Sequence, residues 1–367
     1  MMLLSRVISC LLGVASSTPF FADPAAVSRQ FDETFQAQGL FGSHFGQVGI
    51  PVSYDYVVIG GGTAGLIVAR RLAEPHSVAV IEARGLYELD PAVYNPLIDW
   101  RQKTTPQAGF DGASVYYPHG RALGGGSSRN FMWYQRGSAG SYQKCANEKS
   151  VKFTEPDQQI RAANALPKFD LAAFSPSGGP LQVSYPNFAG PAAALLSQGL
   201  EAIGLVELPG MSSGNLLGWT WVTHAIDPTT QTRSTSESAF LREALQLNGN
   251  LVTDQHTMAK KVLFDGDKRA VGVIVDAGSI GGGSITYTIN ATKEVILSAG
   301  AFRSPQMLMV SGIGPASMLK DNDIEVLADR PGRGQNMWDH IFFGQSHKAN
   351  VASHSALGDP TFAAAAT

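Results

Sequence analysis

The sequence predicts an α/β protein built on a doubly wound sheet, and two adjoining stretches carry that prediction. The first, "YDYVVIGGGTAGLIVARRLAE", starts as a short apolar strand at 56–59, turns at glycines and continues as a helix with one apolar side. The second, "SVAVIEA", has the pattern of a buried strand that ends at Glu82. Strand, turn, helix and strand within about thirty residues form the βαβ unit of a doubly wound sheet.

The glycine turn of this unit has the spacing of a dinucleotide site. Gly60, Gly62 and Gly65 match G-x-G-x-x-G directly after the strand and at the start of the helix. Glycines there allow a tight turn, let backbone approach a pyrophosphate, and pack the helix on the strand. The helix N-terminus adds free N–H groups and a positive dipole end. Glu82 is placed to accept hydrogen bonds from an adenosine ribose, which leaves NAD and FAD both open.

The elements after this unit are predicted from pattern and turn residues. A helix is expected near 192–203, and "RSTSESAFLREAL" at 233–245 has the pattern of a capped helix start. Five strand-like runs follow, with a glycine-rich loop at 281–283 joining a hairpin. The runs are "NLVTDQH", "KKVLF", "AVGVIVDA", "SITYTIN" and "EVILSAGAF".

Composition excludes some classes of partner. The 367 residues carry a formal net charge of -3 and are 44% hydrophobic, which suits a folded soluble protein with a sizeable core. Because no acidic or basic block stands out, neither nucleic acid nor an anionic membrane is expected as a partner. No His or Cys spacing indicates a metal site.

The N-terminus predicts a secreted protein. Arg6 precedes an apolar run at 7–15 and then small residues, so residues 1–22 are expected to be a signal peptide. The run is far shorter than the ~20 residues that span a bilayer, and no membrane span is predicted. The triplet beginning at Asn290 could be glycosylated in that compartment.

A second glycine cluster, "HGRALGGGSSRNFMWYQRG", lies some sixty residues after the first. A nicotinamide enzyme has no need of it, because one crevice already binds both phosphates. FAD is longer and carries a flavin ring that must be held against the substrate. The small residues at 124–128 would let backbone approach the ring, and Asn130 would offer polar contacts at its edge. A glycine-rich surface loop is the other interpretation.

Three motifs in order give the sequence a family resemblance. Residues 120–130, "GAFRSPQMLMVSGIG" at 300–314 and "GQNMWDH" at 334–340 resemble motifs of the glucose-methanol-choline (GMC) oxidoreductases, and the likeness extends over roughly 53–350. The resemblance implies a Rossmann-like FAD-binding domain interleaved with an α+β substrate domain, here incomplete. The implied segments are FAD-binding parts at 53–145 and 216–312, a substrate-domain segment at 146–215, and the start of a second one at 313–367.

The resemblance also implies which residues hold FAD. Some members carry a histidine bonded to the flavin just before the motif's asparagine, and Arg129 stands there in this chain, which predicts noncovalent FAD. The implied cofactor-binding residues are Gly60, Gly62, Thr63, Ala64, Gly65, Glu82, Arg121, Leu123, Gly125, Ser127, Asn130, Phe131, Met132 and Ala259.

No catalytic residue is assigned from the sequence. In the family, a histidine takes the hydroxyl proton of an alcohol while hydride passes to flavin N5, and a second histidine or an asparagine assists. Both lie near the C-terminus of longer members, beyond the last residue of this sequence. His340 matches a family position that is not the base, so a structural role is expected for it. His119, beside the second glycine cluster, is a candidate for contact with flavin or substrate.

The sequence therefore predicts an FAD-dependent oxidoreductase of CH–OH groups. Loops such as "NPLIDW" and "TTPQAG" resemble secreted fungal members that act on aromatic alcohols or polyketide-derived metabolites. Oxygen and a quinone both stay open as electron acceptor. The alternatives are a catalytically silent flavin-binding protein, a carbohydrate or lyase-type member of the same family, and an NAD-dependent dehydrogenase, which would leave the second cluster and residues 300–314 unexplained.

Overall fold

A computed structural model describes residues 49–85, 98–137, 150–161, 165–247, 250–278 and 284–339, with 348, 350, 351, 359 and 361. Residues 46–367 form one compact unit. The predicted signal peptide and His340 lie outside the described residues. In the described part of the chain, no helix is long and apolar enough to cross a membrane.

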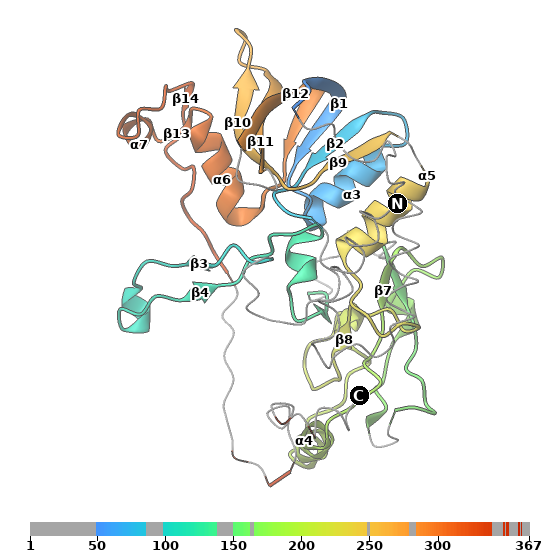
Figure 1. Cartoon of the computed structure of the whole chain (residues 1–367). Helices are drawn as coiled ribbons and strands as arrows, with labels where there is room; N and C mark the ends of the chain where they lie inside the picture. Colours follow the sequence, from blue (N-terminus) through green and yellow to red (C-terminus); the bar gives the residue numbers. More distant parts are fainter. Residues whose placement is uncertain are drawn as a thin grey trace. The chain divides into compact units, whose positions relative to one another are not determined.

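The largest sheet of this unit has six strands, all of which are labelled in Figure 1. Its order is β10-β11-β12-β1-β2-β9, in which β12, β1, β2 and β9 are parallel, and β11 pairs antiparallel with both β12 and the edge strand β10. This arrangement confirms the predicted doubly wound sheet. The strands are β1 (Val52–Ile59), β2 (Val78–Ile81), β9 (Leu251–Asp254), β10 (Thr257–Phe264), β11 (Ala270–Gly278) and β12 (Ser284–Leu297).

Apolar side chains alternate along the central strands and form a core on each face of the sheet. In β1, Val57 and Ile59 point to one core, and Val58 between them points to the other. A parallel sheet needs such strands because both of its faces are covered. Helix α3 (Thr63–Leu72) packs on the Val58 face, and helix α6 (Gly300–Val310) contributes Met307 to the opposite core.

The predicted helices are present, with one irregular start. Helix α4 (Pro191–Ala202) lies where the sequence places it. The second begins as a single π-helical turn, η7 (Glu237–Leu241), and continues as α5 (Arg242–Leu247). Thr235 and Ser238 cap its start: each backbone N–H donates to the other's hydroxyl oxygen, at 2.9 and 3.1 Å. This reciprocal pair is a capping box with serine in place of glutamate.

One strand prediction is wrong. The runs "SITYTIN" and "EVILSAGAF" were expected as separate strands, but they form the single strand β12 of 14 residues followed by the first turn of α6. No glycine or proline stands between the two runs, so nothing breaks the extended chain. The apolar "GAF" belongs to the helix because the chain turns at Ser298 and Ala299. Asn290 lies inside β12, paired with Ser53 and Gly272.

Shorter elements extend from the sheet. Four two-stranded ladders pair β3 with β4, β5 with β8, β6 with β7, and β13 with β14. The predicted domain boundaries stay a prediction. These elements are β3 (Gln102–Lys103), β4 (Tyr116–Tyr117), β5 (Trp133–Tyr134), β6 (Val151–Phe153), β7 (Leu181–Val183), β8 (Thr223–His224), β13 (Ile313–Gly314), β14 (Ala328–Asp329), α7 (Ala316–Lys320), and the 3-10 turns η1 (Ala108–Phe110), η2 (Gly125–Ser128), η5 (Leu171–Ala173) and η6 (Met211–Ser213).

Candidate functional site

A cavity of about 700 Å³ opens at the carboxyl edge of the parallel strands. The last residues of three strands line it: Ile59 of β1, Ile81 of β2 and Leu297 of β12. Further lining comes from the starts of α3 and β10, from α6 along its length and from turn η2. Ligands of open α/β sheets bind in this crevice, and the volume lies within the range of small-molecule sites.

Each glycine of the first cluster has its own reason to lack a side chain. Gly60 has φ +104°, and a Cβ there would lie 2.6 Å from the carbonyl oxygen of Ser298. A Cβ on Gly65 would lie 2.1 Å from the carbonyl oxygen of Gly60. Gly62 differs, because its Cβ would have only the Gly125 Cα within 4 Å, at 3.8 Å. Gly60 and Gly65 are therefore required by the fold, whereas Gly62 leaves space beside the cavity that it lines.

The second glycine cluster folds against the first. The backbone N–H of Gly124 donates to the carbonyl oxygen of Gly61 at 2.8 Å. Gly125 has φ +52°, and a Cβ on it would lie 2.7 Å from the Gly62 Cα. Because the two backbones are this close, only glycine fits at Gly125. Two clusters some sixty residues apart in the sequence thus form one wall of the cavity.

Glu82 lines the cavity and is hydrogen-bonded to the first glycine cluster. Its side chain is buried, and its two carboxylate oxygens accept backbone hydrogen bonds from Gly61 at 3.0 Å and from Arg84 at 3.2 Å. Burial raises the pKa of this carboxyl to about 7, against the lowering effect of those hydrogen bonds. Near neutral pH the carboxyl can therefore accept a hydrogen bond or donate one.

Half of the cofactor-binding residues that the resemblance implies line the cavity in the structure. Gly65 and Leu123 lie in the packing beneath the turns, and Phe131 is 70% exposed. Two sets result. Those lining the cavity are Gly60, Gly62, Thr63, Ala64, Glu82, Gly125 and Ala259, and those outside its lining are Gly65, Arg121, Leu123, Ser127, Asn130, Phe131 and Met132.

Ser127 and Asn130 hold the second cluster in place. The Ser127 hydroxyl donates to the carbonyl oxygen of Gly124 at 2.6 Å and accepts from the backbone N–H of Ser236 at 3.0 Å. The side-chain oxygen of Asn130 accepts from the guanidinium of Arg233 at 2.9 Å. These bonds tie turn η2 to the segment that leads into η7.

Arg129 forms a buried ion pair. Its guanidinium lies 2.5 Å from a carboxylate oxygen of Asp99, and the two side chains are 6% and 0% exposed. The other oxygen of Asp99 accepts from the backbone N–H of Arg101 at 2.5 Å. The side chain of Arg129, the residue before Asn130, is thus buried in the protein interior. Noncovalent binding of a flavin stays a prediction.

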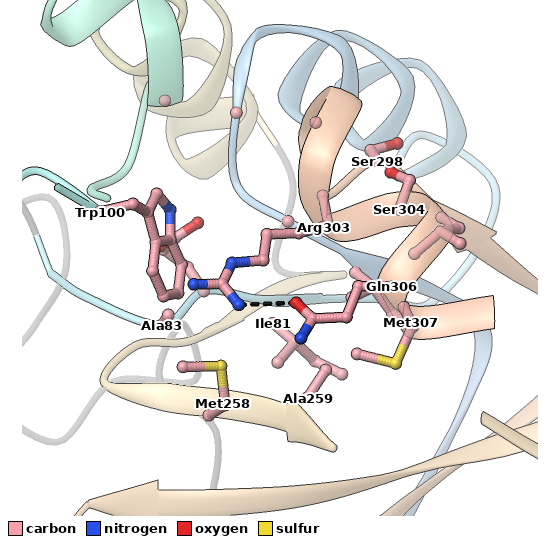
Figure 2. A pocket seen from close by; sticks show the side chains of 18 of the residues that line it. Ile81, Ala83, Trp100, Met258, Ala259, Ser298, Arg303, Ser304, Gln306 and Met307 are labelled. Atoms are coloured by element: carbon pink, nitrogen blue, oxygen red, sulfur yellow. Dashed lines mark hydrogen bonds between the residues drawn. The ribbon is translucent and has the colours of Figure 1, made fainter. Parts of the chain in front are cut away.

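Sequence reasoning assigned no role to two residues of the cavity wall. Trp100 and Arg303 both line the cavity, and the Arg303 guanidinium carbon lies 4.2 Å from the centroid of the Trp100 ring. Figure 2 shows Arg303 extending from α6 toward Trp100, with its hydrogen bond of 2.6 Å to Gln306. Trp100 is the last residue of "NPLIDW", and Arg303 lies in the motif at 300–314. Only the fold brings the two residues together.

His119 also lines the cavity. Its Nδ1 is buried and has no hydrogen-bond partner among the residues that the structure describes. Burial lowers its pKa, as does the nearby charge of Arg303, while Asp99 opposes the shift. The ring is therefore neutral at neutral pH. Across the described ranges, no group of three or more His, Cys, Asp or Glu could hold a metal ion.

Parallel strands with two glycine turns in contact at their carboxyl edge are typical of the Rossmann-like class of dinucleotide-binding folds. Comparison with known proteins gives the family. The family model described as GMC oxidoreductase matches residues 54–342, and the chain belongs to that family, whose members typically bind FAD.

Three similar fungal proteins illustrate the relationship. The chain is 43% identical to versicolorin B synthase of Aspergillus parasiticus over 95% of this chain and 59% of that protein. It is 42% identical to patulin synthase of Aspergillus clavatus, over 90% and 57%. A solved fungal aryl-alcohol oxidase matches with a TM-score of 0.68 and 28% identity, over 77% of this chain and 51% of that one. The chain thus spans less than two thirds of these relatives' length.

Proposed function

We propose that the chain is an FAD-dependent oxidoreductase that acts on the CH–OH group of a small aromatic or polyketide-derived alcohol in secondary metabolism. Family membership supports the cofactor and the reaction class, and the likeness to an aryl-alcohol oxidase supports the substrate class. The observation that carries the proposal is the contact of two glycine turns beside one cavity. The protein is secreted in this proposal, as the pattern at 1–22 predicts.

The residues present fit FAD. The first turn of α3 has no side-chain cap, and Thr63 and Ala64 at its start line the cavity, so their backbone N–H groups would hold the pyrophosphate. Glu82 would bond to the ribose, and the backbone of Ala259 would contact the adenine. Bound FAD supplies the acceptor for the hydride of the alcohol. The protein itself would bind and orient the alcohol and would exclude water from the site.

The second candidate function is flavin binding without turnover. Oxidation of an alcohol needs a base within hydrogen-bond reach of its hydroxyl. Among the described residues, His119 is the histidine that lines the cavity, and no other lines it. Turnover of benzyl-type alcohols by the flavin-loaded chain, with oxygen or a quinone as acceptor, separates the two functions: bound flavin without turnover supports the silent binder.

The test of FAD binding is Gly62→Val. Because the added side chain meets little protein, the variant should fold, yet it blocks the approach of a pyrophosphate to the backbone. We expect loss of flavin absorbance from the purified variant. The matched control is Gly266→Val, since Gly266 also has open space around its Cβ but lies outside the cavity lining. Stoichiometric flavin in Gly62→Val would place the site elsewhere.

Acid precipitation of the wild type tests the mode of binding. Noncovalent FAD passes into the supernatant, whereas yellow colour that stays on the precipitated protein would show a covalent bond and overturn the prediction from Arg129.

A further inference from the structure

Arg161 is a buried cation that the described residues leave without a negative partner. It is 5% exposed, its Nε donates to the carbonyl oxygen of Ala165 at 2.6 Å, and Nη1 donates to that of Pro186. None of the ion pairs within the described ranges includes Arg161. Because carbonyl oxygens carry no net charge, the positive charge stays unmatched, and burial lowers the pKa of the guanidinium.

Aromatic rings surround this guanidinium. Its carbon lies 5.0 Å from the centroid of the Trp221 ring and 5.9 Å from that of the Tyr185 ring. Trp219 meets Trp221 edge to face, with the ring centroids 6.4 Å apart. Trp219 and Trp221 are half-buried, so a ligand at the surface can contact these rings beside the cation.

Trp219 supplies a second donor that lacks an acceptor. Its Nε1 is buried and has no hydrogen-bond partner among the residues that the structure describes. A buried indole N–H usually finds an acceptor, and leaving it unpaired costs free energy. In the same part of the chain, no described residue accepts from Nη2 of Arg161. An anion with two acceptor atoms would satisfy both donors and balance the charge.

The titratable groups around Arg161 do not cancel its charge. Burial lowers the pKa of His224, the hydrogen bond with Val222 opposes this shift, and the charge of Arg161 adds to it, so the ring is neutral at neutral pH. Glu207 is the acidic group whose charge acts on Tyr185. Its carboxylate already lies 3.5 Å from Nζ of Lys168. Arg161 therefore gives this cluster an excess positive charge.

We propose that Arg161, Trp219 and Trp221 form a second binding site, whose ligand is a small aromatic carboxylate. Nη2 of Arg161 and Nε1 of Trp219 donate to the carboxylate, and the aromatic ring of the ligand lies against Trp221. A planar guanidinium beside an indole suits a planar acid better than a compact anion. None of the three residues lines the cavity at the sheet, so this inference goes beyond the FAD proposal and does not depend on it.

The test measures the dissociation constant of benzoate on the full chain by calorimetry, with and without saturating FAD. We expect saturable binding that FAD leaves unchanged. Arg161→Met removes the planar cation, and benzoate should then bind at least about tenfold more weakly. Arg136→Met is the matched control, because Arg136 also donates to a carbonyl oxygen, that of Ala173, and lies over an aromatic ring, that of Phe174. Its dissociation constant should equal that of the wild type.

A second variant removes the other donor and leaves the bonds of Arg161 intact. Trp219→Phe keeps an aromatic ring but loses the indole N–H, so we expect benzoate to bind about fivefold more weakly. Thermal unfolding shows whether each variant is folded. If Arg161→Met does not fold because its bonds to Ala165 and Pro186 are lost, Trp219→Phe decides the proposal.

Three outcomes would overturn the site. They are no saturable binding of benzoate to the wild type, equal affinity for the neutral benzyl alcohol, and equal affinity for inorganic phosphate. Loss of benzoate binding when FAD is added would place benzoate in the cavity at the sheet, which also overturns the second site but leaves the FAD proposal standing. If the chain binds no FAD, the FAD proposal fails, and the effects of Arg161→Met and Trp219→Phe on benzoate still decide this one.

Discussion

The sheet region and the segment at 150–235 differ in how far their apolar side chains are buried. Around the sheet, Val57, Val58 and Val80 are fully buried within two large clusters. Among the described residues of the segment at 150–235, one buried cluster has three members, while Ile203 is 75% exposed and Leu217 88%. The sheet region thus covers its own core, whereas the other segment presents apolar surface of the kind that marks contact sites or favours aggregation.

The largest effect is expected from Asp99→Ala, which tests how strongly the sheet region depends on its buried charges. The change leaves the buried Arg129 without its carboxylate, and breaking such a pair costs about 3–5 kcal/mol in the free energy of unfolding. Urea unfolding measures it. Asp267→Ala, at an exposed turn position, is the control. A loss below 1 kcal/mol for Asp99→Ala would show that the pair is unimportant for stability.

The next test compares the two regions directly. Leu251 in β9 is fully buried, and Leu251→Ala should lower the free energy of unfolding by about 2–5 kcal/mol because it opens a cavity. Ile203→Ala, at an exposed position of the other segment, should change it by about 0.5 kcal/mol or less. Equal losses in the two variants would contradict the comparison.

Glu237 gives a pH dependence to the packing under the second glycine cluster. Its carboxyl is 1% exposed, and burial raises its pKa to about 8 despite Arg242 Nε at 3.3 Å. Since the folded pKa lies above the unfolded value of 4.5, the stability contribution is complete below pH 4.5 and is lost as the pH rises toward 8.

Glu237→Gln should remove that loss. Between pH 5 and pH 7 the variant should gain about 2 kcal/mol relative to the wild type in the free energy of unfolding, measured in urea at each pH. The exposed Glu325→Gln is the control and should show no such gain. A constant difference between Glu237→Gln and the wild type at both pH values would contradict the raised pKa.

The smallest effect on stability is expected from Leu217→Ser. The side chain is 88% exposed, so the free energy of unfolding should stay within about 0.5 kcal/mol of the wild type. Self-association should fall, because apolar surface is removed, and light scattering at increasing protein concentration measures it. A loss above 2 kcal/mol would mean that Leu217 is buried in solution.

The sheet was predictable because its signals are local. The βαβ unit, the close contact of Gly65 with Gly60 and the capped start at Thr235 all depend on residues near one another in the sequence. The break inserted before "EVILSAGAF" was wrong because a long apolar strand and two shorter ones have the same pattern, and only the pairing partners decide between them.

The site was only partly predictable because its other half is nonlocal. Trp100 meets Arg303 across two hundred residues of sequence, and no period or spacing encodes that contact. Asn130 and Phe131 lie in a motif and fall outside the lining of this cavity, so their contacts with flavin stay a prediction.

The contact between Gly62 and Gly125 links folding to ligand concentration. Two chain segments meet there at residues that have no side chains, and both residues line the cavity, so a ligand in the cavity would contact both segments. A ligand that binds the folded state alone raises stability with the logarithm of its concentration, by about 2.7 kcal/mol at a hundredfold excess over its Kd. The supply of nucleotide during synthesis would then set how much of the chain reaches and keeps its folded form.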